Sequence, residues 1–140
     1  MATIAVDFDG TCVKCAFPEI GEGIGATPVL RELVANGHDI ILNTLRENFL
    51  VPTYIHGMKT FPSRNTLDEA VQWFQDREIP LYGINHHPLA TPGAIKVSAD
   101  IYIDDRGLGM PLIDPGDGTS LHVDWERTRQ LLIDIGYIKI

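Results

Sequence analysis

Short apolar runs that end in polar residues are the feature that most constrains what this chain folds into. The first run, residues 2–6, is apolar on both faces and stops at Asp7-Phe8-Asp9-Gly10-Thr11. A strand that is apolar on both sides belongs inside a parallel sheet, where both faces are covered. Similar runs follow at 39–43, 80–84 and 99–103. The sequence therefore predicts a mostly parallel sheet built from these four runs.

Helices are predicted between and after these strands. Thr27-Pro28 has the form of a helix N-cap followed by proline in the first turn, with leucines at helical spacing behind it. Thr66 and Glu69 have the spacing of a capping box, and Asp124 is placed to cap a closing helix. Alternating strands and helices predict an α/β fold, a single three-layer Rossmann-like domain with helices on both faces of the sheet.

The length of the chain limits it to one domain. A chain of 140 residues closes around one core and has no room for a second large domain, so we expect residues 1–140 to form a single catalytic unit. Two connections are longer than usual. Residues 12–26, with three glycines, are a predicted flap, and residues 47–65 are a predicted insertion that includes irregular structure. Because both leave the carboxyl ends of strands, both are expected beside a ligand site.

The charge balance argues against some partners. The chain carries 11 Lys and Arg against 19 Asp and Glu, a net charge of −8, which is the wrong sign for binding duplex nucleic acid or an anionic membrane. No apolar run approaches the roughly 18 to 20 residues that span a bilayer. A secretory signal requires Lys or Arg before its apolar run, and here neither precedes the first apolar run. We therefore expect a cytoplasmic protein.

Acidic side chains gather at the predicted carboxyl ends of the strands. Asp7 and Asp9 end the first strand, and Asp104 and Asp105 end the fourth. Two like charges about 4 Å apart repel by roughly 4 kcal/mol at an effective dielectric of about 20, so a cluster of this density favours a bound cation. Carboxylates without a suitable set of His or Cys are typical ligands of Mg²⁺, which often shares its coordination with substrate phosphate. The predicted cofactor is Mg²⁺.

A phosphoryl group is the substrate feature that such a site predicts. The hydroxyl of Thr44, after the second strand, and the ammonium group of Lys96, before the fourth, can offset charge on its outer oxygens. One aspartate can attack phosphorus to form an aspartyl-phosphate, while a second protonates the departing alkoxide and later activates water. Asp7 and Asp9 are the candidates for these two roles.

These residues resemble the four motifs of the haloacid dehalogenase (HAD) superfamily, and they occur in its order. Asp7-Phe8-Asp9-Gly10-Thr11 is similar to motif I, Thr44 to motif II, Lys96 to motif III and Asp104-Asp105 to motif IV. The resemblance implies that Asp7 is the nucleophile and Asp9 the general acid and base. It implies phosphate binding by Thr44, Lys96, Gly10 and Thr11. It also implies Mg²⁺ binding by Asp7, the Asp9 carbonyl and Asp104, with support from Asp105.

The function that this resemblance implies is a Mg²⁺-dependent phosphomonoester hydrolase that works through an aspartyl-phosphate. The chain resembles a small member without a large cap domain, and caps usually select the substrate in this superfamily. Selection is then expected to fall to the flap 12–26, to the insertion 47–65 or to a partner subunit. Arg46, Lys59 and Arg64 are candidate contacts for an anionic substrate, although each is more often a solvated surface cation.

Two other functions fit part of the pattern. A response-regulator receiver also places acids, a Thr and a Lys around Mg²⁺ on a doubly wound sheet. Its phosphoacceptor aspartate is expected on a middle strand, however, whereas here the acid pair Asp104-Asp105 comes late. A catalytically silent module that binds a phosphorylated ligand has no need of an acid such as Asp9. The phosphatase is therefore the favoured interpretation.

Two further motifs favour structural interpretations. Cys12 and Cys15 form one C-x-x-C, which without a second pair of ligands does not complete a structural zinc site and indicates two reduced thiols. His86 and His87 are adjacent, and adjacent residues seldom both face one ion, so they are interpreted as loop histidines.

Overall fold

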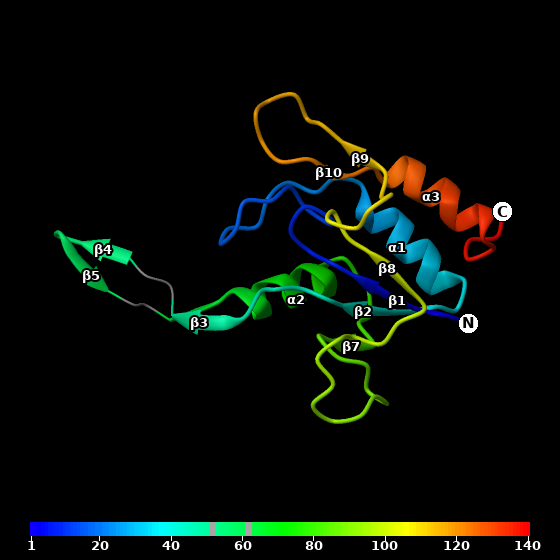
Figure 1. Cartoon of the computed structure of the whole chain (residues 1–140), viewed down its shortest axis with the longest axis horizontal. Coiled ribbons are helices and arrows are strands. Elements are labelled where there is room, and N and C mark those ends of the chain that lie inside the picture. Colours follow the sequence, from blue (N-terminus) through cyan, green and yellow to red (C-terminus); the bar gives the residue numbers. More distant parts are fainter. Residues whose placement is uncertain (51–52, 61–62) are drawn as a thin grey trace.

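A four-stranded parallel sheet forms the centre of the molecule (Figure 1). The structure is a computed structural model that describes residues 1–50, 53–60 and 63–140. The strands are β1 (Thr3–Val6), β2 (Asp39–Leu42), β7 (Gly83–Ile84) and β8 (Ile101–Ile103), in the order β7-β2-β1-β8. The α/β fold and the single Rossmann-like sheet predicted from the sequence are confirmed, although the third strand has two residues where five were expected.

The register of the sheet brings distant polar residues to one edge. Val6, the last residue of β1, lies opposite Leu42 on β2 and Ile103 on β8. Because the three strands run in parallel and end level with one another, the residues that follow them leave the sheet at the same edge. The segments beginning at Asp7, Asn43 and Asp104 are therefore neighbours.

The helices α1 (Ala26–Ala35), α2 (Thr66–Asp76) and α3 (Trp125–Asp134) contribute to one core on one face of the sheet. Alternate strand residues such as Ile4, Val6 and Ile40 point into that core. The residues between them face the other side, where a smaller cluster comprises Ala5, Ile41 and Val97. All three helices therefore pack on one face of the sheet, whereas the sequence predicted helices on both faces. The connection from β7 to β8 carries prolines and glycine in place of a helical pattern, and it packs on the second face as an irregular segment of turns and bends.

All three predicted helices are present, but only one of the three predicted side-chain caps is confirmed. The side chain of Asp124 accepts a hydrogen bond from the amide of Arg127 at 3.1 Å and caps α3. Helix α1 begins after Gly25, whose φ of 98° supplies the turn without a side-chain cap. The hydroxyl of Thr66 donates to the carbonyl of Glu47 at 2.5 Å, so the capping box at Thr66 was wrong. A tertiary contact takes the hydroxyl that a cap would use.

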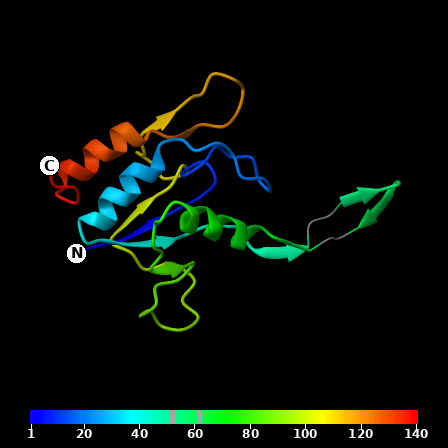
Figure 2. The same ribbon diagram turned by 180° about the vertical axis from the view of Figure 1, so that it is seen from behind.

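The insertion at 47–65 forms an arm of two short antiparallel ladders. Strand β3 (Asn48–Leu50) pairs with β6 (Ser63–Asn65), and β4 (Thr53–Ile55) pairs with β5 (Met58–Thr60). Residues 51–52 and 61–62 of the predicted insertion lie outside the described residues. Figures 1 and 2 show the arm projecting away from the body. In this structure the arm therefore does not lie over the carboxyl edge of the sheet.

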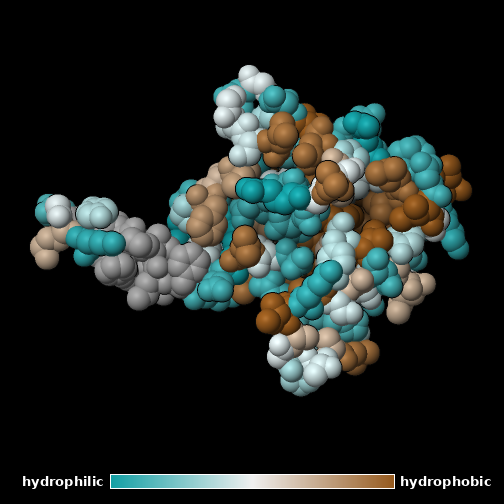
Figure 3. Space-filling view, viewed as in Figure 1, coloured by the Kyte–Doolittle hydropathy of each residue, from teal (hydrophilic) through white to brown (hydrophobic). Residues whose placement is uncertain are grey.

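A second hairpin lies near the C-terminal helix. Strands β9 (Leu112–Ile113) and β10 (His122–Val123) pair antiparallel around the turn-rich segment between them. Hydrophobic and hydrophilic side chains are interspersed over the body of the molecule in Figure 3. Among the helices described, none has the length and apolar character needed to cross a membrane.

Candidate functional site

Two adjoining cavities open at the carboxyl edge of the sheet. The larger, of about 450 Å³, is lined by residues that include Asp7, Asp9, Thr44 and Asp105. The smaller, of about 230 Å³, shares Asp7 and Thr44 and adds Asp104. The structure therefore brings the four predicted aspartates and Thr44 to one place, although they come from three strand ends. A larger hollow elsewhere on the surface, of about 560 Å³, has a mostly apolar lining and none of these residues.

Asp7 is the most perturbed carboxyl group of the site. It is partly buried, and burial together with the neighbouring Asp105 carboxyl raises the pKa of Asp7 to about 7. The amide of Phe8 and the hydroxyl of Thr11, which donates to Asp7 Oδ2 at 3.2 Å, act in the opposite direction. Burial is the largest of these effects. A positive charge here would favour the ionised form of Asp7.

The turn after β1 brings its backbone very close to Asp105. Gly10 has a φ of 80°, and a Cβ atom built on it would lie 2.2 Å from Asp105 Oδ2. Only glycine fits both the left-handed backbone and this approach. The next residue, Thr11, is fully buried, and its carbonyl accepts a hydrogen bond from Trp125 Nε1 at 2.6 Å. Gly10 and Thr11 thus shape the turn and hold Asp7 and Asp105 together.

Thr44 is held at the end of β2 by its neighbours. Its amide donates to Asn85 Oδ1 at 2.8 Å, and its hydroxyl oxygen accepts the amide of Arg46 at 3.1 Å. The hydroxyl hydrogen is left to donate to a ligand in either cavity. Asn85, which follows β7 with a φ of 57°, was missed in the sequence analysis. A polar residue able to adopt positive φ at a strand end is the signal that could have found it.

Arg106 brings an exposed cation to both cavities. Its side chain is 91% exposed, and its Nε lies 3.8 Å from Asp105 Oδ2. Its amide donates to Asp104 Oδ1 at 2.8 Å, which fixes the turn that follows β8. The sequence analysis did not select Arg106, although its position directly after Asp105 was visible. An ion pair at this distance and exposure contributes little stability, which leaves the guanidinium able to contact a ligand.

Arg46 occupies a different position from the one expected of a substrate contact. Its side chain is 1% exposed, and its guanidinium forms a bidentate pair with the carboxylate of Asp9, with two N–O distances of 2.8 Å. Its remaining N–H groups donate to main-chain carbonyls. Because all five guanidinium N–H groups have partners within the chain, the prediction that Arg46 contacts an anionic substrate is corrected. Arg64 likewise binds Glu19 and Glu69.

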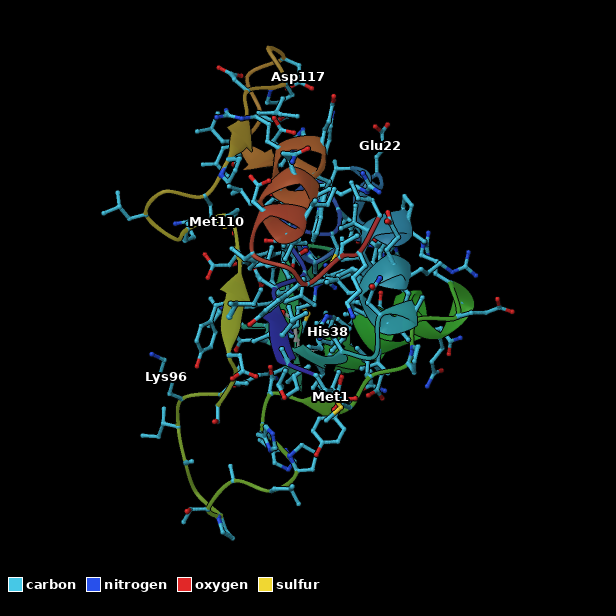
Figure 4. The ribbon with its side chains drawn as sticks, turned by 90° about the vertical axis from the view of Figure 1, so that its right-hand side faces the viewer. Met1, Glu22, His38, Lys96, Met110 and Asp117 are labelled. Atoms are coloured by element: carbon cyan, nitrogen blue, oxygen red, sulfur yellow. The ribbon has the colours of Figure 1, made fainter. Side chains whose placement is uncertain are left out.

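Lys96 is not brought to this edge of the sheet. Its exposed side chain places Nζ 5.1 Å from the centre of the Tyr102 ring. Nearby, the amide of Asp100 bonds to Thr3, the first residue of β1, so this region lies at the amino edge. Figure 4 shows Lys96 and Met110 at opposite ends of β8. A residue shortly before a parallel strand lies at the amino edge of the sheet, opposite the carboxyl edge where the phosphate site is expected. The predicted placement of Lys96 in the phosphate site is therefore corrected.

The flap 12–26 begins with a compact turn. Isolated β-bridges pair Val13 with Asp9 and with Gly23, and the amide of Lys14 donates to the carbonyl of Glu22 at 2.8 Å. Figure 4 shows Glu22 and Asp117 at the same end of the molecule as Met110. The flap therefore lies at the same end of the sheet as the cavities.

The two cysteines of the flap are not joined in a disulfide and differ in exposure. The thiol of Cys12 donates to the carbonyl of Asp7 at 3.3 Å, and burial raises its pKa well above the usual value. Cys15 is exposed and lines the larger cavity. His87 Nδ1 accepts the amide of Leu89 at 3.0 Å, which is a contact typical of a loop histidine.

The donor set fits Mg²⁺ rather than a metal that needs a protein cage. Within residues 1–50, 53–60 and 63–140, no three His, Cys, Asp or Glu side chains lie close enough together to hold a metal ion by themselves. Mg²⁺ keeps several waters and commonly takes only one or two carboxylates. Asp7 and Asp105 supply such a pair, and Asp104 lies beside Asp7 in the smaller cavity. The carboxylate of Asp9, however, is engaged by Arg46, so its side chain is not placed as a ligand.

Comparison with known proteins gives a relative over nearly the whole chain. No protein-family model and no curated protein matches the sequence. Among solved structures, the conserved protein coded by a locus from Bacteroides thetaiotaomicron is similar to this chain, with 32% sequence identity and a TM-score of 0.70. The match covers 96% of this chain and 91% of the Bacteroides chain. An identity of this size over that length shows common family membership, and the chain belongs to the family of this conserved Bacteroides protein.

Proposed function

We propose that the protein is a Mg²⁺-dependent phosphomonoester hydrolase of the HAD type that works through an aspartyl-phosphate. The observation that carries the proposal is the partly buried pair of Asp7 and Asp105 beside Thr44, in which the pKa of Asp7 is raised to about 7. Such a pair is costly without a cation and becomes a strong ligand when one binds. One carboxylate of the pair is also a candidate to attack phosphorus.

Asp7 is assigned the role of nucleophile. Its carboxylate attacks the phosphorus of the ester, and the bond from phosphorus to the leaving oxygen breaks as the bond to Asp7 forms. The carboxylates that would hold Mg²⁺ are Asp7 and Asp105, with the main-chain carbonyl of Asp9, and Asp104 lies in the adjoining cavity in support. When bound there, Mg²⁺ offsets negative charge on the phosphoryl oxygens and on Asp7. Water then attacks the aspartyl-phosphate and restores the carboxylate.

Asp9 is assigned the proton transfers. It lies two residues after Asp7 and lines the same cavity. In this role it delivers a proton to the leaving alkoxide and then accepts one from the attacking water, which requires one of its oxygens to be released from the pair with Arg46. The hydroxyl of Thr44 donates to an outer phosphoryl oxygen. Arg106, whose guanidinium is exposed at both cavities, takes the electrostatic role that the sequence analysis gave to Lys96.

Phosphate release from a panel of esters tests the proposal. The protein is incubated with alkyl, sugar, nucleoside and aryl phosphates in the presence and absence of Mg²⁺, beside an Asp7→Asn variant. We expect Mg²⁺-dependent release that the variant lacks. If the wild type releases no more phosphate than Asp7→Asn on every ester, the proposal is wrong. Stable labelling of one aspartate by acetyl phosphate without turnover would favour a receiver-like module instead.

The cytoplasm is the proposed location of this activity. Two reduced thiols, one of them exposed at the larger cavity, suit a reducing compartment. The proposed substrate is a phosphorylated compound other than duplex nucleic acid or membrane lipid, because the charge of −8 disfavours both of these polyanions.

A further inference from the structure

Part of the lining of the larger cavity is apolar. Phe17 of the flap and Leu45, which follows Thr44, line this cavity of about 450 Å³ together with the charged residues of the site. A phosphoryl group is only about the size of a few water molecules, of roughly 30 Å³ each, so it fills a fraction of this volume. The cavity therefore has room for the group to which the phosphate is attached.

Leu45 presents its side chain to solvent at the site. It is 99% exposed and lines both the larger and the smaller cavity. A single exposed leucine on a protein surface is ordinary. At the mouth of a ligand cavity, however, a ligand with an apolar group covers this surface, and water is released from both partners. Leu45 therefore favours a ligand that is apolar where it meets this side chain.

The backbone that carries Leu45 is held on both sides. The amide of Thr44 donates to Asn85 Oδ1 at 2.8 Å, and the amide of Arg46 donates to the hydroxyl oxygen of Thr44 at 3.1 Å. The side chain of Arg46 is buried and anchors the chain beyond Leu45. Because the position of Leu45 is fixed before a ligand binds, binding restricts little more than the rotation of its side chain.

Leu45 lies next to the residue assigned to the phosphoryl group. Consecutive Cα atoms are about 3.8 Å apart. A phosphoryl oxygen that accepts the hydroxyl of Thr44 therefore brings the first atoms of the esterified group within reach of the Leu45 side chain. The part of the substrate that Leu45 contacts is the part attached to the phosphate, and we expect this part to be apolar.

Phe17 adds an aromatic surface to the same cavity. The centre of its ring lies 5.2 Å from the guanidinium carbon of Arg46, and the residue remains 45% exposed. Aromatic rings pack favourably against one another when they are offset or edge to face. A hydroxylated sugar at this place loses hydrogen bonds to water and gains no hydrogen-bond partner from Phe17 or Leu45. The lining therefore favours an aromatic ring over a sugar.

We propose that the substrate is a phosphate monoester with an aromatic ring close to phosphorus, as in an aryl or benzyl ester, and that Leu45 is the residue that selects it. The anchoring of the phosphoryl group by Thr44 rests on the proposed function, whereas the apolar preference of the cavity does not. Phosphonates, in which carbon is bonded directly to phosphorus, are not hydrolysed by attack at phosphorus of this kind. They test the preference without any activity.

Binding of two phosphonates measures the preference. Isothermal titration calorimetry in the presence of Mg²⁺ compares benzylphosphonate with methylphosphonate, which differ only in the ring. We expect the Kd of benzylphosphonate to be lower by about 10-fold or more. Leu45→Asn, which keeps the approximate size of the side chain and makes it polar, should reduce this ratio about 5-fold or more. Because Leu45 is exposed, this variant removes no core contact and should fold as the wild type does.

Leu108→Asn is the matched control. Leu108 follows β8 and is as exposed as Leu45. In the described part of the chain, however, Leu108 is not among the residues that line the two cavities. The variant therefore makes the same chemical change on the surface but outside the site. We expect the ratio of the two Kd values to stay within about 2-fold of the wild-type ratio.

Two esters test the same preference in turnover. Benzyl and ethyl phosphate release alcohols of similar acidity, so a difference in kcat/KM reports contact with the ring and not the ease of leaving. We expect kcat/KM to be higher for benzyl phosphate by about 10-fold or more, and Leu45→Asn to remove most of this difference. A nucleoside monophosphate carries its ring beyond a ribose, so its kcat/KM should change less than about 2-fold in this variant.

The outcomes separate this inference from the proposed function. If no ester is hydrolysed but the wild type prefers benzylphosphonate and Leu45→Asn loses that preference, the enzymatic proposal fails and the apolar preference stands. If esters are hydrolysed but the two phosphonates bind with equal Kd, the inference is refuted in an active enzyme. It is also refuted if Leu45→Asn and Leu108→Asn behave alike, or if the nucleoside monophosphate depends on Leu45 more than benzyl phosphate does. If neither phosphonate binds, both proposals are wrong.

Discussion

At the scale of single residues, the site is defined by how each charge is balanced. Asp9 is balanced by a buried guanidinium that approaches it in the bidentate geometry, and Asp7 has only hydrogen-bond donors and another carboxyl group around it. Two aspartates two positions apart thus experience opposite environments.

Asp7→Asn should stabilise the metal-free protein at neutral and higher pH. The pKa of Asp7 is about 7 in the folded state against an ordinary value of 3.8, so the folded state binds this proton more tightly than the unfolded state. The resulting stabilisation is complete below about pH 4 and is lost as pH rises through about 7. The variant should therefore be more stable than the wild type by roughly 2 to 4 kcal/mol at about pH 8, and by little at about pH 4.

Urea unfolding in the presence of a chelator measures this difference. Asp114→Asn, in the exposed turn between β9 and β10, is the control and should show no such dependence on pH. A constant difference between Asp7→Asn and the wild type across this range would contradict the raised pKa.

Mg²⁺ should stabilise the wild type more at alkaline than at acidic pH. Binding to Asp7 and Asp105 competes with the proton that Asp7 keeps up to about pH 7. At a Mg²⁺ concentration of about 100 times Kd, the gain is about 2.7 kcal/mol. Thermal unfolding with and without Mg²⁺ at about pH 8 and about pH 5.5 measures it. An equal shift in Tm at both pH values, or a full shift in Asp105→Asn, would argue against this site.

Arg106→Ala should weaken substrate binding. Its guanidinium is 91% exposed at the mouth of both cavities, where it attracts the phosphate dianion before the reaction and throughout it. We expect KM to rise about 5- to 20-fold with kcat lowered by less, because uniform binding energy is lost. Steady-state kinetics on one ester test this, with Lys96→Ala as the control that should change neither constant by more than about 2-fold.

At the scale of elements, the turn that follows β1 is the most constrained segment. Gly10 needs a positive φ and leaves no space for a Cβ beside Asp105, whereas Gly37, after α1, has a φ of 87° and nothing within 4 Å of the position that a Cβ would take. The two positions share the backbone requirement and differ only in the close approach. Alanine substitutions at the two positions therefore separate the cost of the positive φ from the cost of the close approach to Asp105.

Gly10→Ala should lower both the free energy of unfolding and the stabilisation by Mg²⁺ more than Gly37→Ala does. The conformational cost alone is about 1 to 2 kcal/mol at either position, and Gly10→Ala must in addition displace the carboxylate of Asp105. We expect the thermal stabilisation by Mg²⁺ to be abolished in Gly10→Ala and retained in Gly37→Ala. Parallel unfolding curves with and without Mg²⁺ test this, and equal behaviour of the two variants would show that the approach to Asp105 does not matter.

The strands could be predicted from the sequence because their signals are local. Both faces of β1 and β2 are buried, which gives continuous apolar runs, and a parallel register then places Asp7, Thr44 and Asp104 at one edge. The partner of Asp9 could not be predicted in this way. Arg46 is 37 positions away, and its burial depends on carbonyls supplied by the flap and α2. A basic residue that is fully paired by tertiary contacts has the same local sequence signal as a solvated one.

At the scale of the whole molecule, a body with one main core carries a projecting arm. The arm joins the body through local contacts near its base, such as Asn48 Nδ2 to Asp68 Oδ1 at 3.0 Å and Thr66 to Glu47. The main core is made of residues of the sheet and of α1, α2 and α3, together with the segments that join them. The body should therefore fold without the distal part of the arm.

Replacing residues 51–62 by Asn-Gly, a two-residue hairpin turn, should leave the body intact. We expect the free energy of unfolding to change by less than about 1 kcal/mol and the stabilisation by Mg²⁺ to persist. Urea unfolding and a Mg²⁺ titration check both points. A loss of several kcal/mol would mean that the arm packs on the body in solution.

The hydrogen bond from Trp125 to the carbonyl of Thr11 has an optical consequence. The indole of Trp125, which is only 3% exposed, donates to the turn that follows Asp7 and senses the polarity and order of that turn. Its emission spectrum should shift when the turn is reordered by a ligand, with Trp73→Phe removing the other indole from the signal. The chain thus contains an intrinsic fluorophore through which occupancy of the site can be followed without labels.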